Sequence, residues 1–197
     1  IHVIQNQIAS IECSLLMNSS ETIISSKRGV PLIIPVQDTL LGLYVITKNN
    51  NIDKSIVFDI SMIIEININI KLQLWNYLNN DKLSLKSDIY PGYFVFSLLL
   101  DDKFYYNYNN INIQEGIILY NKSNIIGINN TILCSGYKSI IHEYVFSVGR
   151  KETCIFVSNL CKITNLYLSR YGFSIEIPKS IDINIDDIID NEYLFNI

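Results

Sequence analysis

The sequence is poor in charge, and acidic residues outnumber basic ones. Charged residues make up 17% of the 197 positions, and the formal net charge is −4. A surface that binds nucleic acid needs clustered Lys and Arg to contact phosphates. The composition therefore argues against a broad nucleic-acid-binding surface supplied by this chain alone, although short basic pairs such as Lys27 and Arg28 can line part of a path for anions.

The sequence also lacks the features of a zinc site, a secreted protein and a membrane protein. Its four cysteines, at positions 13, 134, 154 and 161, include no Cys-x-x-Cys pair, so we expect reduced thiols and no zinc. No charged-then-apolar leader opens the sequence, and no apolar run approaches the roughly 20 residues of a membrane span, so we expect no membrane partner. An initiator Met is absent, and we expect Ile1 to be a cut end of a longer protein.

A cluster of carboxylates suited to metal-dependent catalysis is missing too. Asp101 and Asp102 are adjacent, and neighbouring residues of a strand point to opposite faces, so the two cannot chelate one ion together. Asp186, Asp187 and Asp190 lie in an acidic tail. We expect both groups to be solvated, no residue of the chain to be catalytic or to bind a metal, and the chain alone to be inactive.

What the sequence has in abundance is isoleucine and asparagine. Hydrophobic residues make up 49% of the chain, which is enough for one domain with a real core and too many for extensive disorder. Isoleucine is β-branched and favours half-buried strands. We therefore expect a globular domain that contains β-structure.

Three segments show the spacing of amphipathic helices. Apolar residues recur at helical intervals over 7–17 and 153–170, and Gly172 suits the left-handed conformation that ends the second helix. A shorter helix is predicted over 38–47, with Gly42 as its weak point.

Other segments favour strands, because apolar and polar residues alternate or form short apolar runs. The clearest of them, 93–100, is entered through a Pro-Gly turn. The predicted strands or extended segments are 32–36, 56–60, 63–74, 93–100 and a β-pair over 111–120. Mixed strands flanked by helices, without regular β-α-β alternation, predict an α+β fold.

Four blocks, within 1–17, 25–47, 90–122 and 171–177, occur in an order that is typical of one protein family. The most specific contains Gln37 and Asp38 between two apolar runs. The blocks resemble the His-Val-Pro-Gln segment, the Gln-Asp block, the Val-Phe-Ser segment with its hairpin, and the Gly-Phe-Ser-Ile segment of the largest subunit of multisubunit DNA-dependent RNA polymerases. The resemblance is closer to eukaryotic, RNA polymerase III-like or viral subunits than to bacterial ones.

The resemblance implies that the chain is a fragment of that subunit with a pore-domain-like fold. Residues 1–20 would be the C-terminal edge of the active-site barrel domain, 21–172 the pore domain and 173–197 the start of the funnel domain. The whole subunit would transcribe a DNA template into RNA from nucleoside triphosphates, together with other polymerase subunits. It would bind Mg²⁺ through aspartates just upstream of Ile1. Its location would be the nucleus, or the cytoplasm or virion for a viral protein.

The resemblance also implies which residues lie near the catalytic centre and the pore: His2, Gln5, Gln37 and Asp38. Asp38 has the alternative role of a helix cap, and Gln37 that of a hydrogen-bond donor to a loop carbonyl. For His2 the alternative is a structural hydrogen bond.

Two further groups have a functional and a structural interpretation. Lys27 and Arg28 are candidate phosphate contacts, or part of a solvated loop. Tyr105, Tyr106 and Tyr108 can stack on bases, but no cations are interleaved with them, which favours a surface or interface loop.

A different class of protein also fits the composition. A standalone, non-enzymatic β-rich interaction module would have Ile-rich strands as its core and loops rich in Asn and Tyr as its binding surface. A third interpretation is the product of a degenerate polymerase-like pseudogene. The interaction module does not explain four collinear blocks.

Overall fold

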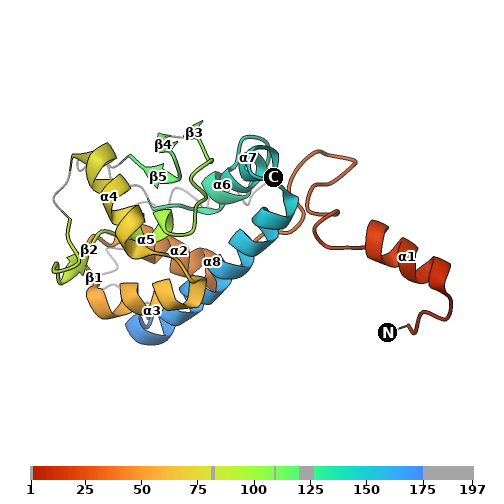
Figure 1. Ribbon diagram of the computed structural model, residues 1–197, viewed down its shortest axis with the longest axis horizontal. Helices are drawn as coiled ribbons and strands as arrows, with labels where there is room; N and C mark the ends of the chain where they lie inside the picture. The colour runs from red at the N-terminus through yellow and green to blue at the C-terminus, as the bar shows by residue number, and fades with distance from the viewer. Residues whose placement is uncertain (1, 81–82, 109, 120–126, 175–197) are drawn as a thin grey trace, which may run out of the picture.

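Helices form most of the structure, and the longest of them, α8, runs along the body of the molecule (Figure 1). A computed structural model describes residues 2–80, 83–108, 110–119 and 127–174. In this part of the chain the helices are α1 (Gln7–Leu16), α2 (Asp38–Lys48), α3 (Lys54–Ile64), α4 (Ile68–Asn79), α5 (Gly92–Ser97), α6 (Asn130–Leu133), α7 (Ile140–Ser147) and α8 (Arg150–Tyr171). The strands are β1 (Ile52–Asp53), β2 (Ile89–Tyr90), β3 (Tyr106–Tyr108), β4 (Ile111–Gln114) and β5 (Ile117–Ile118). The predicted α+β class is confirmed.

The contact between α2 and α8 lies at the centre of the core. Both helices were predicted, and Gly172, with φ of 71°, ends α8 as expected. Gly42, expected to weaken α2, is needed for its packing against α8. A Cβ atom at this position would lie 2.9 Å from Cβ of Thr164. The apolar residues that α8 buries recur at helical spacing: Phe156, Val157, Leu160, Ile163 and Tyr167.

The segment 93–100 is not the predicted strand. It forms α5 and the turn that follows, and every residue of α5 is buried. A Cβ atom on Gly92 would lie 1.7 Å from the carbonyl oxygen of Ile46, so α5 begins directly against the end of α2. A short helix that is buried on all sides has no polar face, and its sequence cannot be distinguished from that of a buried strand.

The strands predicted over 56–60 and 63–74 are also wrong, because α3 and α4 occupy these residues. The Asn67 side chain caps α4 by accepting a hydrogen bond from the Asn69 N–H at 3.0 Å. Ile68, Leu72 and Trp75 all face the core at helical spacing. Their burial overrides the strand preference of the isoleucines and the poor helix propensity of the asparagines in this segment.

Two small antiparallel sheets complete the described fold, β1–β2 and β3–β4–β5. The predicted β-pair around Glu115 and Gly116 is confirmed, and both turn residues have positive φ, 51° and 69°. The sheet is tied to the core, since the Ile118 N–H donates to Ser97 Oγ of α5 at 3.1 Å. Residues 32–36 form no strand; Pro31 alone makes a bridge, with Ile24.

The segment before residue 20 forms an arm that stands away from the body (Figure 1). Its helix, α1, was predicted, and the Asn6 side chain caps it by accepting from the Ala9 N–H at 2.7 Å. No residue of α1 is buried.

Candidate functional site

The Gln-Asp pair lies in a strained turn at the start of α2. Gln37 has φ of 47° and ψ of −117°. The Thr39 N–H donates to the Val36 carbonyl at 3.1 Å, which closes a four-residue turn with Gln37 at its first central position. These angles are those of a type II′ turn, a conformation dominated by glycine. A residue with a side chain there costs about 1–3 kcal/mol, which the rest of the fold must offset.

The side chains of this pair are exposed and serve neither of the structural roles that the sequence suggested. The N-cap position of α2 belongs to Gln37, and its side chain makes no capping hydrogen bond. Asp38 is the first residue of the helix, where its charge interacts favourably with the helix dipole. Within the described residues, the turn therefore presents an amide and a carboxylate to the surroundings.

His2 and Gln5 lie elsewhere. Both are exposed and belong to the arm, whereas α2 lies inside the body (Figure 1). This chain by itself therefore does not bring His2 and Gln5 next to Gln37 and Asp38.

Lys27 and Arg28 lie in a turn that is held against the α6–α7 connection. The Tyr137 hydroxyl donates to the Arg28 carbonyl, and the Gly29 N–H donates to the Ser25 carbonyl at 2.8 Å. The side chains of Lys27 and Arg28 are exposed and form no ion pair within the described chain. The turn thus fixes the backbone and leaves both charges available.

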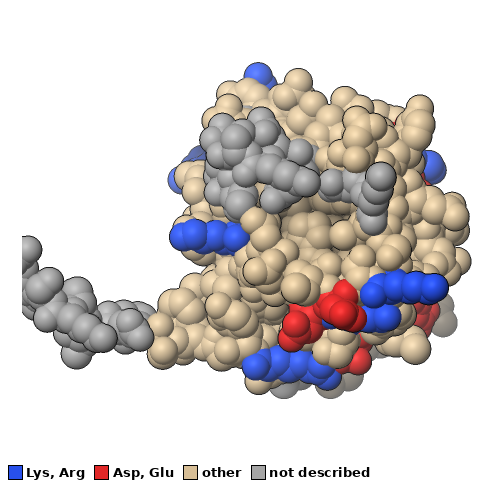
Figure 2. Space-filling view, turned by 90° about the vertical axis from the view of Figure 1, so that its left-hand side faces the viewer, with Lys and Arg blue, Asp and Glu red and all other residues tan. Residues whose placement is uncertain are grey.

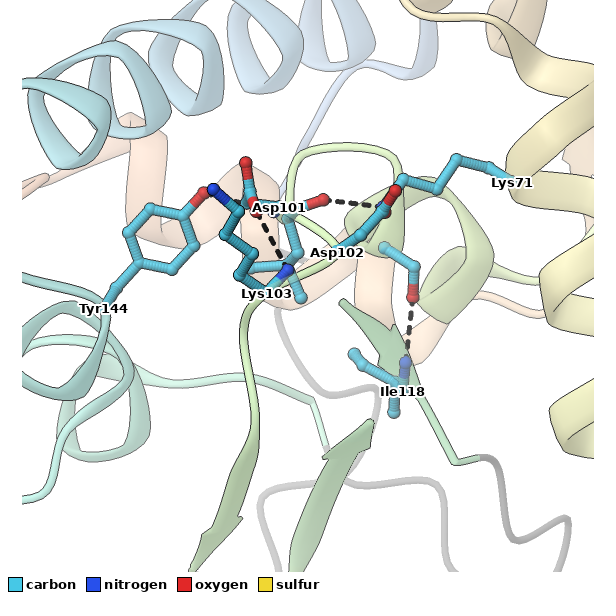
Figure 3. Close-up of polar contacts among 8 residues, drawn as sticks. Lys71, Asp101, Asp102, Lys103, Ile118 and Tyr144 are labelled. Carbon is cyan, nitrogen blue, oxygen red and sulfur yellow. Dashed lines mark hydrogen bonds and ion pairs between the residues drawn. The ribbon is translucent and has the colours of Figure 1, made fainter. Parts of the chain in front are cut away.

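The pair Asp101 and Asp102 is not simply solvated, and it does not lie in a strand. Asp102 Oδ1 lies 2.5 Å from Lys71 Nζ, and the Lys71 side chain is only 8% exposed (Figure 3). Lys71 also donates to the Leu100 carbonyl at 2.7 Å. Asp101 Oδ1 accepts from the Lys103 N–H at 2.9 Å. Asp102 therefore ties the turn after α5 to α4, and Asp101 stabilises the turn itself.

Tyr144 from α7 completes this arrangement, and no sequence signal pointed to it. The Asp101 N–H donates to the Tyr144 hydroxyl oxygen at 3.1 Å (Figure 3). Burial raises the pKa of Tyr144 to about 12; the hydrogen bond from Asp101 lowers it, and the charges of Asp101, Glu152 and Asp102 raise it further. Tyr144 is a neutral hydroxyl at physiological pH and not an acid or base.

The described residues do not fit a magnesium site. Within 2–80, 83–108, 110–119 and 127–174, no group of three or more His, Cys, Asp or Glu side chains is placed to hold a metal ion. Asp101 and Asp102 are engaged in the contacts given above.

The four cysteines are free thiols, and burial raises the pKa of Cys134 to about 11, so that this thiol is unreactive. No described helix combines the length and apolarity of a membrane span.

The tyrosine run is divided between the core and the surface. Tyr106 is 4% exposed, and its hydroxyl donates to the Lys138 carbonyl at 2.9 Å. Tyr105 and Tyr108 are exposed, and Lys138 Nζ lies 5.0 Å from the Tyr108 ring centroid. A cation does accompany these rings, although it is distant in sequence.

Basic and acidic side chains adjoin one another on the face shown in Figure 2. The residues described there form no continuous basic surface. Elsewhere Arg150 pairs with Glu21, 2.6 Å away.

The described residues thus combine a closed helical core with an exposed polar turn at Gln37 and Asp38. The chain belongs to the family described as RNA polymerase Rpb1, domain 3, whose model matches residues 22–178.

Similar proteins occur in bacteria, eukaryotes and viruses. The chain is 28% identical over 202 residues to a DNA-directed RNA polymerase subunit beta' of Chlorobium phaeovibrioides, covering 92% of the chain and 13% of that protein. It is 24% identical to DNA-directed RNA polymerase II subunit RPB1-B of Trypanosoma brucei brucei, covering 92% and 10%. A probable RPB1 homolog of Invertebrate iridescent virus 6 is 26% identical, covering 88% and 18%. The chain thus spans between a tenth and a fifth of the length of these relatives.

Proposed function

We propose that the chain is a segment of the largest subunit of a DNA-directed RNA polymerase, which synthesises RNA on a DNA template from nucleoside triphosphates. The observation that carries this proposal is the family match over residues 22–178. The alignment with relatives from three kinds of organism, over about nine-tenths of the chain, supports it. The other polymerase subunits, DNA, RNA and nucleotides are the partners of the whole protein.

Within that enzyme the segment has a scaffold role. The limits proposed for it are an edge of the active-site barrel over 1–20, the pore over 21–172 and the start of the funnel from 173. The family match from residue 22 supports the first boundary. Mg²⁺ would be bound by aspartates just upstream of Ile1, and the described residues supply no ligand set of their own. The location of the chain is that of its polymerase, the nucleus or, for a viral enzyme, the cytoplasm or virion.

Gln37 and Asp38 are the residues that we assign to contacts near the reacting nucleotides. Backbone strain that the rest of a fold sustains is concentrated at functional sites. The strained turn keeps the side chains of Gln37 and Asp38 exposed. Glycine at position 37 would adopt the same turn more easily, but it would supply no side chain to contact a nucleotide. His2 and Gln5 would join them only through the fold of the preceding domain, and Lys27 and Arg28 are candidate contacts to phosphates.

The standalone interaction module has lost its main support. Its proposed core consisted of Ile-rich strands, and the segments 56–60, 63–74 and 93–100 are helices or turns. A β-rich binding module therefore does not describe this chain.

The test is to purify the complete subunit through an affinity tag and to identify its partners by mass spectrometry. We expect peptides of this chain to be found in a complex that extends RNA on a DNA template and requires Mg²⁺. The 197-residue chain alone, as a control, should be inactive. A tagged subunit that purifies without other polymerase subunits and makes no RNA contradicts the proposal.

The site assignment has its own test, Gln37→Gly in the complete subunit. Glycine relieves the positive φ, so the chain should become more stable by about 1 kcal/mol. If the Gln37 side chain contacts the reacting nucleotides, elongation should nevertheless slow about tenfold, which corresponds to about 1.4 kcal/mol. Lys162→Ala, on the exposed face of α8, is the matched control and should change neither quantity. Unchanged elongation in Gln37→Gly would show that the residue only forms the turn.

A further inference from the structure

A groove of about 450 Å³ lies between the α3–α4 turn, the segment 99–102 and the N-terminal half of α8. Three elements that are distant in sequence form its walls, and Lys71 and Asp102 hold two of them together. Because that ion pair fixes α4 to the turn after α5, the groove is part of the folded core and not a gap beside a loop.

The groove carries an excess of negative charge. Four carboxylates line it, from Glu65, Asp101, Asp102 and Glu152, against the single ammonium group of Lys71. That ammonium group already pairs with Asp102. In the part of the chain that the structure describes, the other three carboxylates form no ion pair. Phosphates and anionic lipid headgroups would therefore be repelled, and a cation attracted.

The groove also has exposed apolar side chains. Ile70 of α4 is 57% exposed and Ile155 of α8 is 61% exposed, and both line the groove. A partner that covered either isoleucine would bind more tightly, since burying apolar area contributes about 25 cal/mol per Å² to the free energy of binding. A small inorganic cation would satisfy the carboxylates and leave these isoleucines in water. The combination fits a longer occupant with both aliphatic and positively charged groups.

We propose that this groove docks a basic amphipathic segment of another polypeptide. Its Lys or Arg side chains pair with Glu65, Asp101 and Glu152, and its aliphatic side chains cover Ile70 and Ile155. A second copy of this chain is a poor occupant, because its net charge is −4. In the proposed function, on which this inference rests, that polypeptide is another subunit of the polymerase.

The test places the photo-crosslinker p-benzoylphenylalanine at Ile155 in the complete subunit, within its assembled polymerase, and therefore rests on the proposed function. The matched control carries the same crosslinker at Phe146, which is 69% exposed and does not line the groove. We expect Ile155 to crosslink to a peptide in which Lys or Arg alternates with aliphatic residues, and Phe146 not to reach that peptide.

Charge reversal then tests the recognition. Glu65→Lys together with Glu152→Lys should lower the yield of that crosslink about tenfold in low salt, because attraction becomes repulsion. Salt at 1 M shortens the Debye length to about 3 Å and should remove most of the difference. If the double variant does not assemble, Glu65→Gln, at an exposed turn residue, should still lower the yield severalfold.

Every other outcome overturns the docking proposal. These outcomes are no crosslink from Ile155, a crosslink to nucleic acid, lipid or a second copy, a crosslink to a neutral or acidic peptide, and a yield that does not respond to the charge changes. A subunit that does not enter a polymerase at all contradicts the proposed function instead, so the two failures are distinguishable.

Discussion

The arm helix α1 and the core helix α8 have similar sequence patterns and opposite surroundings. Both were predicted from apolar residues at helical spacing, and both formed. The α8 helix buries its apolar face, whereas α1 exposes Ile8, Ile11, Leu15 and Leu16 by 57–73%. The comparison shows that periodicity determines whether a helix forms, but the presence of a partner determines whether it contributes to stability.

The sharpest test of this contrast is truncation of one apolar side chain in each helix. Phe156→Ala removes a ring that is 2% exposed and stacks on Tyr144, so the free energy of unfolding should fall by about 3–5 kcal/mol. Leu15→Ala in α1 should change it by less than about 0.5 kcal/mol. Urea denaturation of the chain measures both values. Equal losses would show that α1 is packed in solution.

A second test adds volume where the core has no room. Gly92→Ala directs a methyl group at the Ile46 carbonyl oxygen, 1.7 Å away, and should destabilise the chain by about 3 kcal/mol. The control is Gly136→Ala, which meets nothing within 4 Å and has only its φ of 88° to oppose it, about 1 kcal/mol. Thermal unfolding compares the two. A mild effect at Gly92 would mean that the start of α5 can move away from α2.

A third test uses alkaline pH, which should affect the core and not the arm. Burial raises the pKa of Tyr144 to about 12 in the folded chain, from an ordinary value of 10.0. Tyr144 therefore contributes full stability below pH 10. As the pH rises from 10 to 12, the unfolded chain loses its proton first and stability falls, by about 2 kcal/mol. Tyr144→Phe should flatten this part of the pH profile in denaturant titrations. An unchanged profile in the variant would assign the loss to other groups.

The smallest expected effect compares two ion pairs. Asp102→Asn weakens a pair whose Lys71 side chain is 8% exposed, and should cost about 1 kcal/mol, because Asp102 itself is 62% exposed. Glu21→Gln, in the exposed pair with Arg150 near the base of the arm, should cost about 0.3 kcal/mol and less in high salt. Chemical denaturation at two salt concentrations separates them. A larger effect at Glu21 would reverse the ranking of core and periphery.

The sequence predicted those elements whose signals are local. The helices at 7–17, 38–47 and 153–170 have periodic apolar residues, and the 111–120 hairpin has a turn that suits positive φ. The failures at 56–60 and 63–74 arise because isoleucine favours strands intrinsically, and the tertiary burial of residues such as Ile60 and Leu72 makes these segments helical. The segment 93–100 contains no isoleucine or asparagine, and it was taken for a strand because a short helix that is buried on all sides has no polar face.

The candidate site was predicted in its residues but not in its geometry. Gln37 and Asp38 were identified from sequence, whereas a positive φ at a glutamine leaves no sequence signal. Lys71 was missed because its helix was taken for a strand. Its ion pair with Asp102, a side chain that is 62% exposed, was not expected. An isolated Lys four residues before the single Trp of the chain was the available signal.

The bare apolar side of α1 has a consequence for the cell that makes this chain. A chain that is not built into its complex displays a hydrophobic stripe of the kind that drives aggregation. Chaperones and proteases act on chains that expose such surface, so covering α1 would also protect the chain from them. A helix that adds nothing to the stability of the body described here is therefore a face that its surroundings in a longer polypeptide or complex must keep away from water.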